Sequence, residues 1–318
     1  MITETKRFPA ARRLAGVLAG SAVAALMAAA PVAQAQAQDI TVGSKIDTEG
    51  ALLGNMLMIL LEDAGFTVDN KIQLGATSVV RQALIAGEID IYPEYTGNGA
   101  FFFDRQGDQA WNNRGAGYEL VSQLDAQENN LVWLTPAPAN NTWALAVRQD
   151  VAAENDLETM EDFGAWVSGG GDAMLAASAE FVESPNALPA FQEAYGFELT
   201  DDQMLVLSGG DTAATIRAAA EQTNGTNTAM VYGTDGALSA VGLVVMEDTQ
   251  GVQMVYEPAP VVRGEVLEEH PEIRDIIDPV FETLGLQTLQ SLNAAIIVEG
   301  RDAGQVARSY LEEEGFIN

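Results

Sequence analysis

Side chains that could perform catalysis are scarce in this sequence. The chain of 318 residues contains no cysteine and one histidine, His270, which lies in the acidic stretch Glu268–Pro271. A zinc site and a serine–histidine pair therefore lack essential parts, and a lone histidine in such a setting is usually a surface residue. The glycines Gly169–Gly171 are not followed by Lys-Ser or Lys-Thr, so they do not match a phosphate loop. We expect a binding protein without a cofactor or metal, and not an enzyme.

An alternation of strands and helices begins at residue 39 and points to two loops as a binding region. The expected elements are a strand over Asp39–Gly43, a helix over Glu49–Ala64, a strand over Lys71–Gly75, a helix over Thr77–Ala86 and a strand over Ile89–Tyr92. This order predicts a parallel sheet with right-handed crossovers. Because ligands bind beyond the carboxyl ends of such strands, the loops Ser44–Thr48 and Pro93–Gly99 are candidate ligand contacts. Asp47 or Thr48 is expected to cap the first helix, and Thr77 to cap the second, which Gly87 ends.

The middle of the chain indicates a second unit that is reached through a crossing segment. Strand-like residues 131–135 and 143–147 flank the proline- and asparagine-rich stretch Pro136–Thr142, and the chain is expected to cross back near Thr234–Gly236. Further strands are expected at 174–177, 205–207, 229–232, 241–247 and 253–262, and helices at 159–168, 187–195, 212–221, 271–285 and 303–314. The length suits two α/β units with an ample core.

Residues 1–38 have the order of a secretory signal peptide. Four basic residues precede an apolar, alanine-rich run over Leu14–Val32, and the small-residue segment Ala33–Gln38 follows. Cleavage after Ala35 or Ala37 fits this order, so we expect the segment to be removed. Since no cysteine is available for a lipid anchor, the mature protein is expected in the periplasm and not as a lipoprotein.

The remaining chain, residues 39–318, is strongly acidic. It carries 11 basic and 45 acidic residues, a net charge of −34. Such a surface disfavours nucleic acid and anionic lipid as partners. Only two lysines, Lys45 and Lys71, occur in this part of the chain, and Lys45 directly follows the first expected strand, where ligand contacts are expected.

Several segments together resemble one family of binding proteins. They are Gly43–Lys45, Glu49, Leu53–Met56, Leu74–Thr77, Ile89–Gly97, Asn141–Val147, Leu188–Pro189, Tyr195–Phe197 and Tyr232–Asp235. The set resembles the glycine betaine/choline-type substrate-binding proteins of ABC importers. Its most specific part is Tyr-Pro-Glu-Tyr-Thr-Gly at Tyr92–Gly97, and the segment Ser44–Gly50 is similar to the osmoprotectant-binding branch of the family.

The resemblance implies a fold, a set of partners and a mode of action. The fold would be α/β, a two-lobed periplasmic binding protein (type II-like) with two parallel-sheet lobes joined by two crossing strands. Lobe 1 would comprise residues 39–140 and 240–318, and lobe 2 residues 141–239. The protein would act as a monomer that closes on a small quaternary amine, and its closed form would be recognised by an ABC permease and its ATPase.

The resemblance also implies a binding site that suits such a ligand. A quaternary ammonium has no N–H group to donate, so aromatic faces hold it by cation–π attraction, at roughly 0.5–2 kcal/mol per ring. The resemblance assigns Tyr95, Trp143 and Tyr232 as aromatic walls and Lys45 as the contact to a ligand carboxylate. Each has a structural alternative: the aromatic residues could pack the hinge or core, and Lys45 could pair with Asp47.

Departures from the family pattern leave the ligand open. Thr212, with Ala213 and Ala214 after it, stands where a fourth aromatic wall is expected. Ser184 replaces an arginine, and Asn98 a hydroxyl donor. Asn141, Asp211 and Thr212 complete the set of candidate ligand contacts.

Two interpretations follow. Either betaine binds weakly, or the pocket suits another ligand, and Asp47 and Asp211 would favour a cation without a carboxylate. The alternatives are the same fold with a different small polar amine or amino-acid derivative, or a non-transport envelope protein on this clamp fold.

Overall fold

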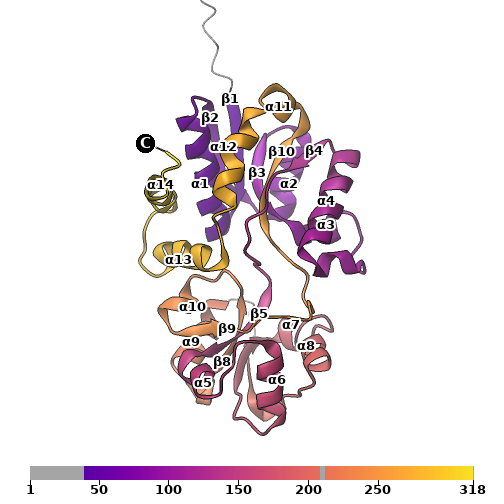
Figure 1. Cartoon of the computed structure of the whole chain (residues 1–318), viewed down its shortest axis with the longest axis vertical. Coiled ribbons are helices and arrows are strands. Elements are labelled where there is room, and N and C mark those ends of the chain that lie inside the picture. Colours follow the sequence, from indigo (N-terminus) through magenta and orange to yellow (C-terminus); the bar gives the residue numbers. More distant parts are fainter. Residues whose placement is uncertain (1–38, 208–211, 318) are drawn as a thin grey trace, which may run out of the picture. The chain divides into compact units, whose positions relative to one another are not determined.

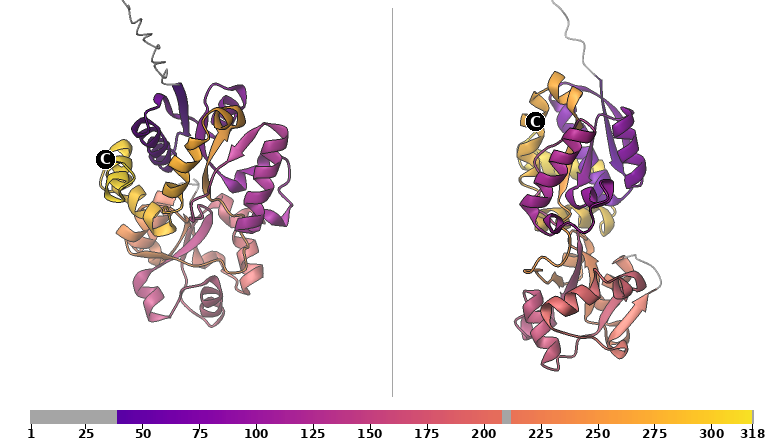
Figure 2. Two further views of the ribbon diagram at one scale, coloured as in Figure 1. Left: turned by 45° about the horizontal axis from the view of Figure 1, so that its top comes forward. Right: turned by 90° about the vertical axis from the view of Figure 1, so that its right-hand side faces the viewer.

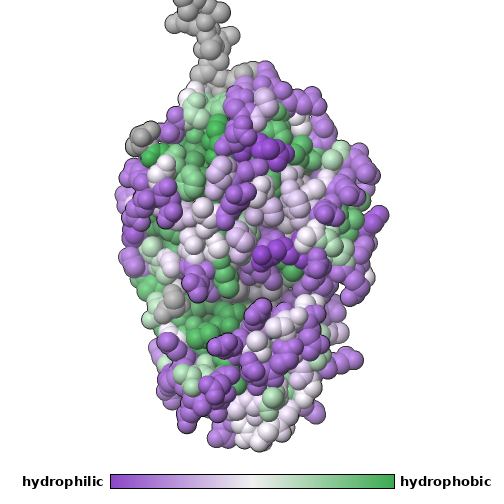
Figure 3. Space-filling model, viewed as in Figure 1, coloured by the Kyte–Doolittle hydropathy of each residue, from purple (hydrophilic) through white to green (hydrophobic). Residues whose placement is uncertain are grey.

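The computed structural model describes residues 39–207 and 212–317, which form two α/β lobes, each built on one five-stranded sheet (Figure 1, Figure 2). The expected signal segment and Asp211 lie outside these residues. Helices pack against each sheet, and two segments, residues 134–142 and 246–257, connect the lobes. Polar and charged side chains cover most of the face shown in Figure 3, in keeping with the acidic composition.

The first sheet has the strand order β2-β1-β3-β10-β4 and the second the order β7-β6-β8-β5-β9. The strands of the first sheet are β1 (Asp39–Lys45), β2 (Thr67–Gly75), β3 (Ile91–Tyr95), β4 (Leu131–Trp133) and β10 (Pro258–Arg263). Those of the second are β5 (Trp143–Arg148), β6 (Leu175–Ser178), β7 (Met204–Leu207), β8 (Thr228–Tyr232) and β9 (Leu243–Val245). The expected α/β class and the two lobes are confirmed.

Both sheets are mixed, whereas the expected lobes were parallel-sheet lobes. β1 runs parallel to β2 and β3, but β10 is antiparallel to β3 and β4. In the second sheet β5 is antiparallel to β8 and β9. The reason is the connection between lobes: β5 and β10 are the strands that enter each lobe from a crossing segment. They start beside the carboxyl ends of β8 and β3, so they must run in the opposite direction.

The boundary between the lobes also differs from the expected one. We expected residues 240–318 to belong to lobe 1, but β9 pairs with β5 in the second sheet, so the return crossing follows Val245. The helices of lobe 1 are α1 (Thr48–Asp63), α2 (Thr77–Ala86), α3 (Gly99–Phe102), α4 (Arg114–Glu128), α11 (Gly264–Glu269), α12 (Glu272–Phe281), α13 (Leu286–Ile297) and α14 (Ala303–Glu313). Those of lobe 2 are α5 (Gln149–Glu154), α6 (Met160–Ser168), α7 (Ala179–Glu183), α8 (Leu188–Tyr195), α9 (Thr212–Ala220) and α10 (Ala237–Ala240).

Helix α1 anchors lobe 1 and places the residues before it. Its apolar side chains recur at helical spacing, and Leu53, Met56 and Leu57 are fully buried in the main core of this lobe. At its start, the Asp47 carboxylate accepts a hydrogen bond from the Gly50 N–H at 2.6 Å, as an N-cap does. The loop between β1 and α1 is thereby fixed at the edge of the sheet where the carboxyl ends of the parallel strands lie.

Helix α2 is ended as expected but begins without a cap. Gly87 closes it in the left-handed region at φ 73°, a conformation that glycine adopts without strain. Its N-cap position is Ala76, which offers no side-chain acceptor, and Thr77 is already helical. Among the described residues, none of the helices is both long and apolar enough to span a membrane.

Candidate functional site

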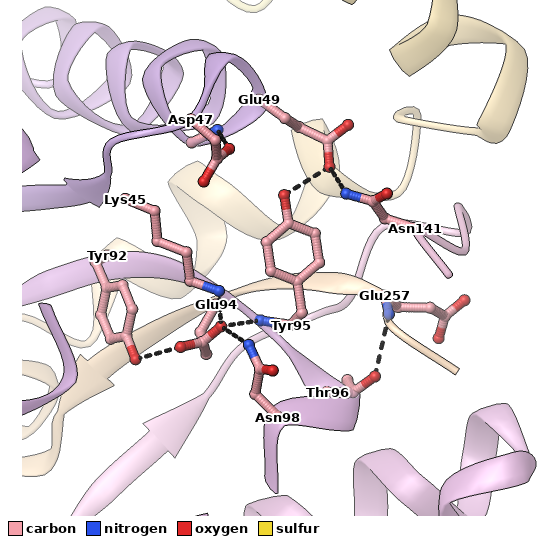
Figure 4. A network of polar contacts seen from close by, with 11 residues as sticks. Lys45, Asp47, Glu49, Tyr92, Glu94, Tyr95, Thr96, Asn98, Asn141 and Glu257 are labelled. Carbon is pink, nitrogen blue, oxygen red and sulfur yellow. Dashed lines mark hydrogen bonds and ion pairs between the residues drawn. The ribbon is translucent and has the colours of Figure 1, made fainter. Parts of the chain in front are cut away.

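Glu94 is the centre of a buried polar network at the end of β3 (Figure 4). Its carboxylate accepts hydrogen bonds from the Tyr92 hydroxyl at 2.8 Å, the Tyr95 N–H at 2.7 Å and the Asn98 side-chain amide at 2.8 Å. It also forms a buried ion pair with Lys45. Glu94 thus fixes the turn after β3 and also neutralises the one lysine of the site.

The Lys45 ammonium lies over the face of Tyr95 (Figure 4). Its Nζ is 4.4 Å from the ring centroid, within the range of a cation–π contact. The hydroxyl of Tyr95 donates to Glu49 at 2.7 Å. Burial raises the pKa of Tyr95 well above its ordinary value, and the negative charge of Glu49 adds to this. The predicted aromatic wall and the predicted carboxylate contact are therefore bound to each other.

Glu49, in the first turn of α1, joins three separate segments of the chain. Besides the Tyr95 hydroxyl, it accepts from the amide of Asn141 at 3.2 Å and from that of Asn293 at 2.7 Å. Desolvation by burial raises the pKa of its carboxyl, and hydrogen bonds from side chains that include Tyr95 and Asn293 oppose that rise. Sequence reasoning noted Glu49 only as part of a motif. Glu49 precedes Tyr95 by 46 residues and Asn293 by 244, so no local sequence pattern points to these contacts.

One cavity, which we call the charged cavity, opens beside this network. Its volume is about 610 Å³. Its lining residues are Lys45, Asp47, Thr48, Glu49, Thr77, Tyr95, Asn98, Asn141, Thr212, Tyr232, Thr234, Asp235, Gly236, Asn293 and Ile297. Three carboxylates, those of Asp47, Glu49 and Asp235, form an acidic wall, while the Lys45 ammonium is engaged by Glu94. The local charge favours a cation.

A second cavity, which we call the aromatic cavity, has a volume of about 690 Å³. It is lined by Phe101, Gln106, Gln109, Asn112, Asn141, Thr142, Trp143, Glu180, Ser184, Asn186, Ala190, Tyr232, Gly251, Val252, Gln253, Met254 and Tyr256. The rings of Trp143 and Tyr232 stack with centroids 6.4 Å apart and planes inclined by 23°. Trp143 also packs edge-on against Phe181 beneath it. Asn141 and Tyr232 line both cavities, so the two adjoin.

The structure distributes the predicted site residues over these two cavities. Lys45, Tyr95, Asn98 and Thr212 line the charged cavity, and Trp143 and Ser184 line the aromatic cavity. The two shared residues named above complete the set, apart from Asp211, which lies outside the described residues. The suggested pairing of Lys45 with Asp47 is replaced by the pair with Glu94.

Helix α13, which the sequence analysis did not predict, contributes to the site from the far end of the chain. Its Gln290 amide donates to the Gly233 carbonyl at 2.7 Å. Asn293 donates to the Thr234 carbonyl at 3.0 Å as well as to Glu49. These bonds hold the turn that follows β8, next to Tyr232.

Glu257, just before β10, is a buried carboxylate that sequence reasoning also missed. Its side chain is 1% exposed, and Arg114 Nε lies 2.5 Å from Oε1. Neither carboxylate oxygen forms a hydrogen bond with the described residues. Desolvation raises the pKa of Glu257 to about 7, although Arg114 lowers it.

Comparison with known proteins gives this site its context. A family model described as the substrate binding domain of the ABC-type glycine betaine transport system matches residues 38–313. The glycine betaine-binding protein YehZ of Escherichia coli (strain K12) is 56% identical over 298 residues, 94% of this chain and 97% of that protein. A glycine-betaine-binding protein of Pseudomonas aeruginosa is 31% identical over 290 residues, 89% of this chain and 90% of that protein.

The fold agrees with these matches. The solved structure of apo YehZ from Escherichia coli is 58% identical in sequence and has a TM-score of 0.85. The match covers 87% of this chain and 99% of that chain. By sequence and by fold, the chain belongs to the family of substrate-binding domains of ABC-type glycine betaine transport systems.

Proposed function

We propose that the protein captures a small quaternary-amine osmolyte such as glycine betaine or choline, with low affinity, for an ABC importer. The observation that carries this proposal is the stacked pair Trp143 and Tyr232 beside a cavity with an acidic wall. Aromatic faces and carboxylates are the groups that attract a cation without N–H donors. The names of the two relatives, both glycine betaine-binding proteins, support this ligand class.

Low affinity follows from two groups that the site does not supply. Thr212, at the start of α9, lines the charged cavity where the family pattern has an aromatic wall. Ser184 lines the aromatic cavity where the pattern has an arginine. The loss of one aromatic ring weakens binding by roughly tenfold, and so does the loss of one bidentate contact to the ligand carboxylate.

The charge of the site favours a cation over a zwitterion. The acidic wall attracts a positive head group, whereas a ligand carboxylate would lie near three like charges. Lys45, the group expected to hold that carboxylate, is paired with Glu94. Choline should therefore compete well with glycine betaine.

The mode of action is that of a clamp. Ligand bound between the lobes would shift the protein from an open to a closed population, and no bond is made or broken. The monomeric closed form would dock on the permease, whose ATPase drives uptake. Residues 1–38 would direct export and be cleaved, which leaves the mature protein in the periplasm. N-terminal sequencing of the exported protein tests the cleavage.

Titration calorimetry tests the ligand. Glycine betaine, choline, carnitine and ectoine are each added to the mature protein, with tryptophan fluorescence as a second signal. We expect weak, saturable binding of choline and glycine betaine. Heat and fluorescence that stay unchanged at millimolar concentrations of all four compounds would contradict the proposal, and turnover of a compound by the isolated protein would favour an enzyme.

A matched pair of variants tests the site. Trp143→Ala should weaken choline binding by about tenfold, because one wall of the stacked pair is lost. Trp166→Ala is the control, since Trp166 packs against Phe163 in α6 and lines neither cavity. Equal affinities of the two variants would mean that the ligand binds elsewhere.

A further inference from the structure

We propose that Lys45 is a specificity-determining residue that acts as a tethered occupant of the cation subsite on Tyr95. In this role it competes with the ligand's ammonium group and lowers the affinity for every cationic ligand. This inference deepens the proposed function and rests on it. It inverts the role that the family resemblance assigned to Lys45, which was attraction of a ligand carboxylate.

The geometry places the Lys45 ammonium where a ligand cation would gain most. Lys45 Nζ is 4.4 Å from the centroid of Tyr95, and both residues line the charged cavity. A quaternary ammonium on the same face of the ring would have to occupy the same space. The Tyr95 hydroxyl is bound to Glu49, so the ring does not turn away to offer another face without breaking that bond.

The charge balance explains why Lys45 stays in place. It is 6% exposed, and its ammonium is paired with the buried carboxylate of Glu94. Withdrawal of the ammonium would leave Glu94 charged and without a counter-ion in a buried position, which is costly. Two cations on one ring face would repel each other at close range. A ligand cation must therefore either displace Lys45 or bind instead to the aromatic faces of Trp143 and Tyr232.

Removal of the lysine should free the subsite. Methionine is uncharged and one atom shorter than lysine, so Lys45→Met removes the ammonium from the Tyr95 face and leaves its position open to a ligand cation. Tetramethylammonium, the simplest quaternary ammonium, reports on this subsite because it has no other functional group. We expect Lys45→Met to bind tetramethylammonium and choline about tenfold more tightly than the natural protein does.

The chain offers a matched control. Lys71 is the other lysine of residues 39–318, its side chain is 47% exposed, and it pairs with Asp69 at 3.3 Å outside both cavities. Lys71→Met changes the net charge equally and should leave all affinities unchanged. A neutral isostere of choline, 3,3-dimethylbutan-1-ol, separates charge from space: Lys45→Met should change its affinity much less than that of choline.

Calorimetry at constant ionic strength distinguishes the outcomes. Tighter binding of tetramethylammonium in Lys45→Met alone supports the inference. No gain in that variant, an equal gain for the neutral isostere, or weaker binding of glycine betaine with no gain for tetramethylammonium overturns it. Where Lys45→Met fails to fold, judged by circular dichroism, Lys45→Met/Glu94→Gln removes both charges and should still bind tetramethylammonium more tightly.

The result also separates this inference from the proposed function. If the natural protein binds quaternary amines and the variants gain nothing, only the role of Lys45 fails. If neither the natural protein nor any variant binds a quaternary amine, the proposed function fails and the role of Lys45 fails with it.

Discussion

Tyr95 and Tyr232 end corresponding strands of the two sheets, yet their surroundings are opposite. Tyr95 lies across from Pro258, and Tyr232 across from Trp143, the residues that begin the strands entering each lobe. Tyr95 is 7% exposed, with its face covered by Lys45 and its hydroxyl bound to Glu49. Tyr232 is 38% exposed, and its ring stacks on Trp143 alone among the aromatic contacts of the described chain.

The difference shows that equal positions in a fold can serve a ligand in different ways. The residues around Tyr95 are already held in place, because Lys45 pairs with Glu94 and covers the ring. A ligand therefore gains little there unless it displaces Lys45. The Tyr232 ring is half-exposed, and among the described residues no cation lies over it, so a ligand gains the full cation–π contact there. The stability of the fold should therefore depend chiefly on the residues around Tyr95, and the affinity for the ligand on those around Tyr232.

Loss of the Glu94 carboxylate should have the largest effect. Glu94→Leu leaves the Lys45 ammonium buried without its counter-ion and removes the acceptor of three hydrogen bonds. We expect the free energy of unfolding in urea to fall by about 3–5 kcal/mol. Asp69→Ala is the control, since it breaks the exposed pair with Lys71 and should cost about 0.5 kcal/mol or less. Equal losses of unfolding free energy in the two variants would show that the buried network around Glu94 does not stabilise the region around Tyr95.

Glu257 gives the Tyr95 side a pH dependence. Its folded pKa, about 7, lies above the ordinary value of 4.5, so the native state binds more protons between these values. Stability should therefore decline as pH rises from about 4.5 to 7, by up to about 3 kcal/mol. Glu257→Gln should remove this decline, which makes the variant more stable than the natural protein at pH 8 and about equal near pH 4.5. Parallel pH profiles of the two proteins in thermal unfolding would refute this.

Local sequence signals were sufficient for the elements that position the site. The Asp47 cap, the end of α2 at Gly87 and the strand endings at Tyr95 and Tyr232 all depend on neighbouring residues, and each lies where we expected or within a few residues of it. The two α/β lobes followed from the order of these elements.

The contacts that decide the chemistry were not accessible to the same reasoning. The pair of Lys45 with Glu94 spans 49 residues, and the bond between Asn293 and Glu49 spans 244. Such partners are selected by burial in the folded chain, because a charge removed from water must find a counter-charge wherever the fold provides one. No local pattern indicated that β10 runs antiparallel to β3, because these two strands lie far apart in the sequence.

The two tyrosines can be exchanged for leucine to test the comparison directly. Tyr232→Leu should weaken choline binding by about tenfold and change stability by less than about 1 kcal/mol, because the ring is half-exposed. Tyr95→Leu should do the reverse, with a stability loss of about 2–4 kcal/mol and a small change in affinity. Calorimetry and urea unfolding on the same samples measure both quantities. A larger affinity loss in Tyr95→Leu would mean that the ligand displaces Lys45 in the natural protein.

The smallest expected effect concerns the acidic wall, and Asp47 allows its two roles to be separated. Asp47 caps α1 and also lines the charged cavity. Asp47→Ser retains a cap and removes the charge, whereas Asp47→Ala removes both, so only the alanine variant should lose about 1 kcal/mol of stability. Both should bind choline about twofold more weakly, and more so at low ionic strength, because screening weakens the contribution of an exposed charge. If both variants bind choline as the natural protein does, the charge of Asp47 adds nothing to affinity, and any attraction by the acidic wall must come from Glu49 and Asp235.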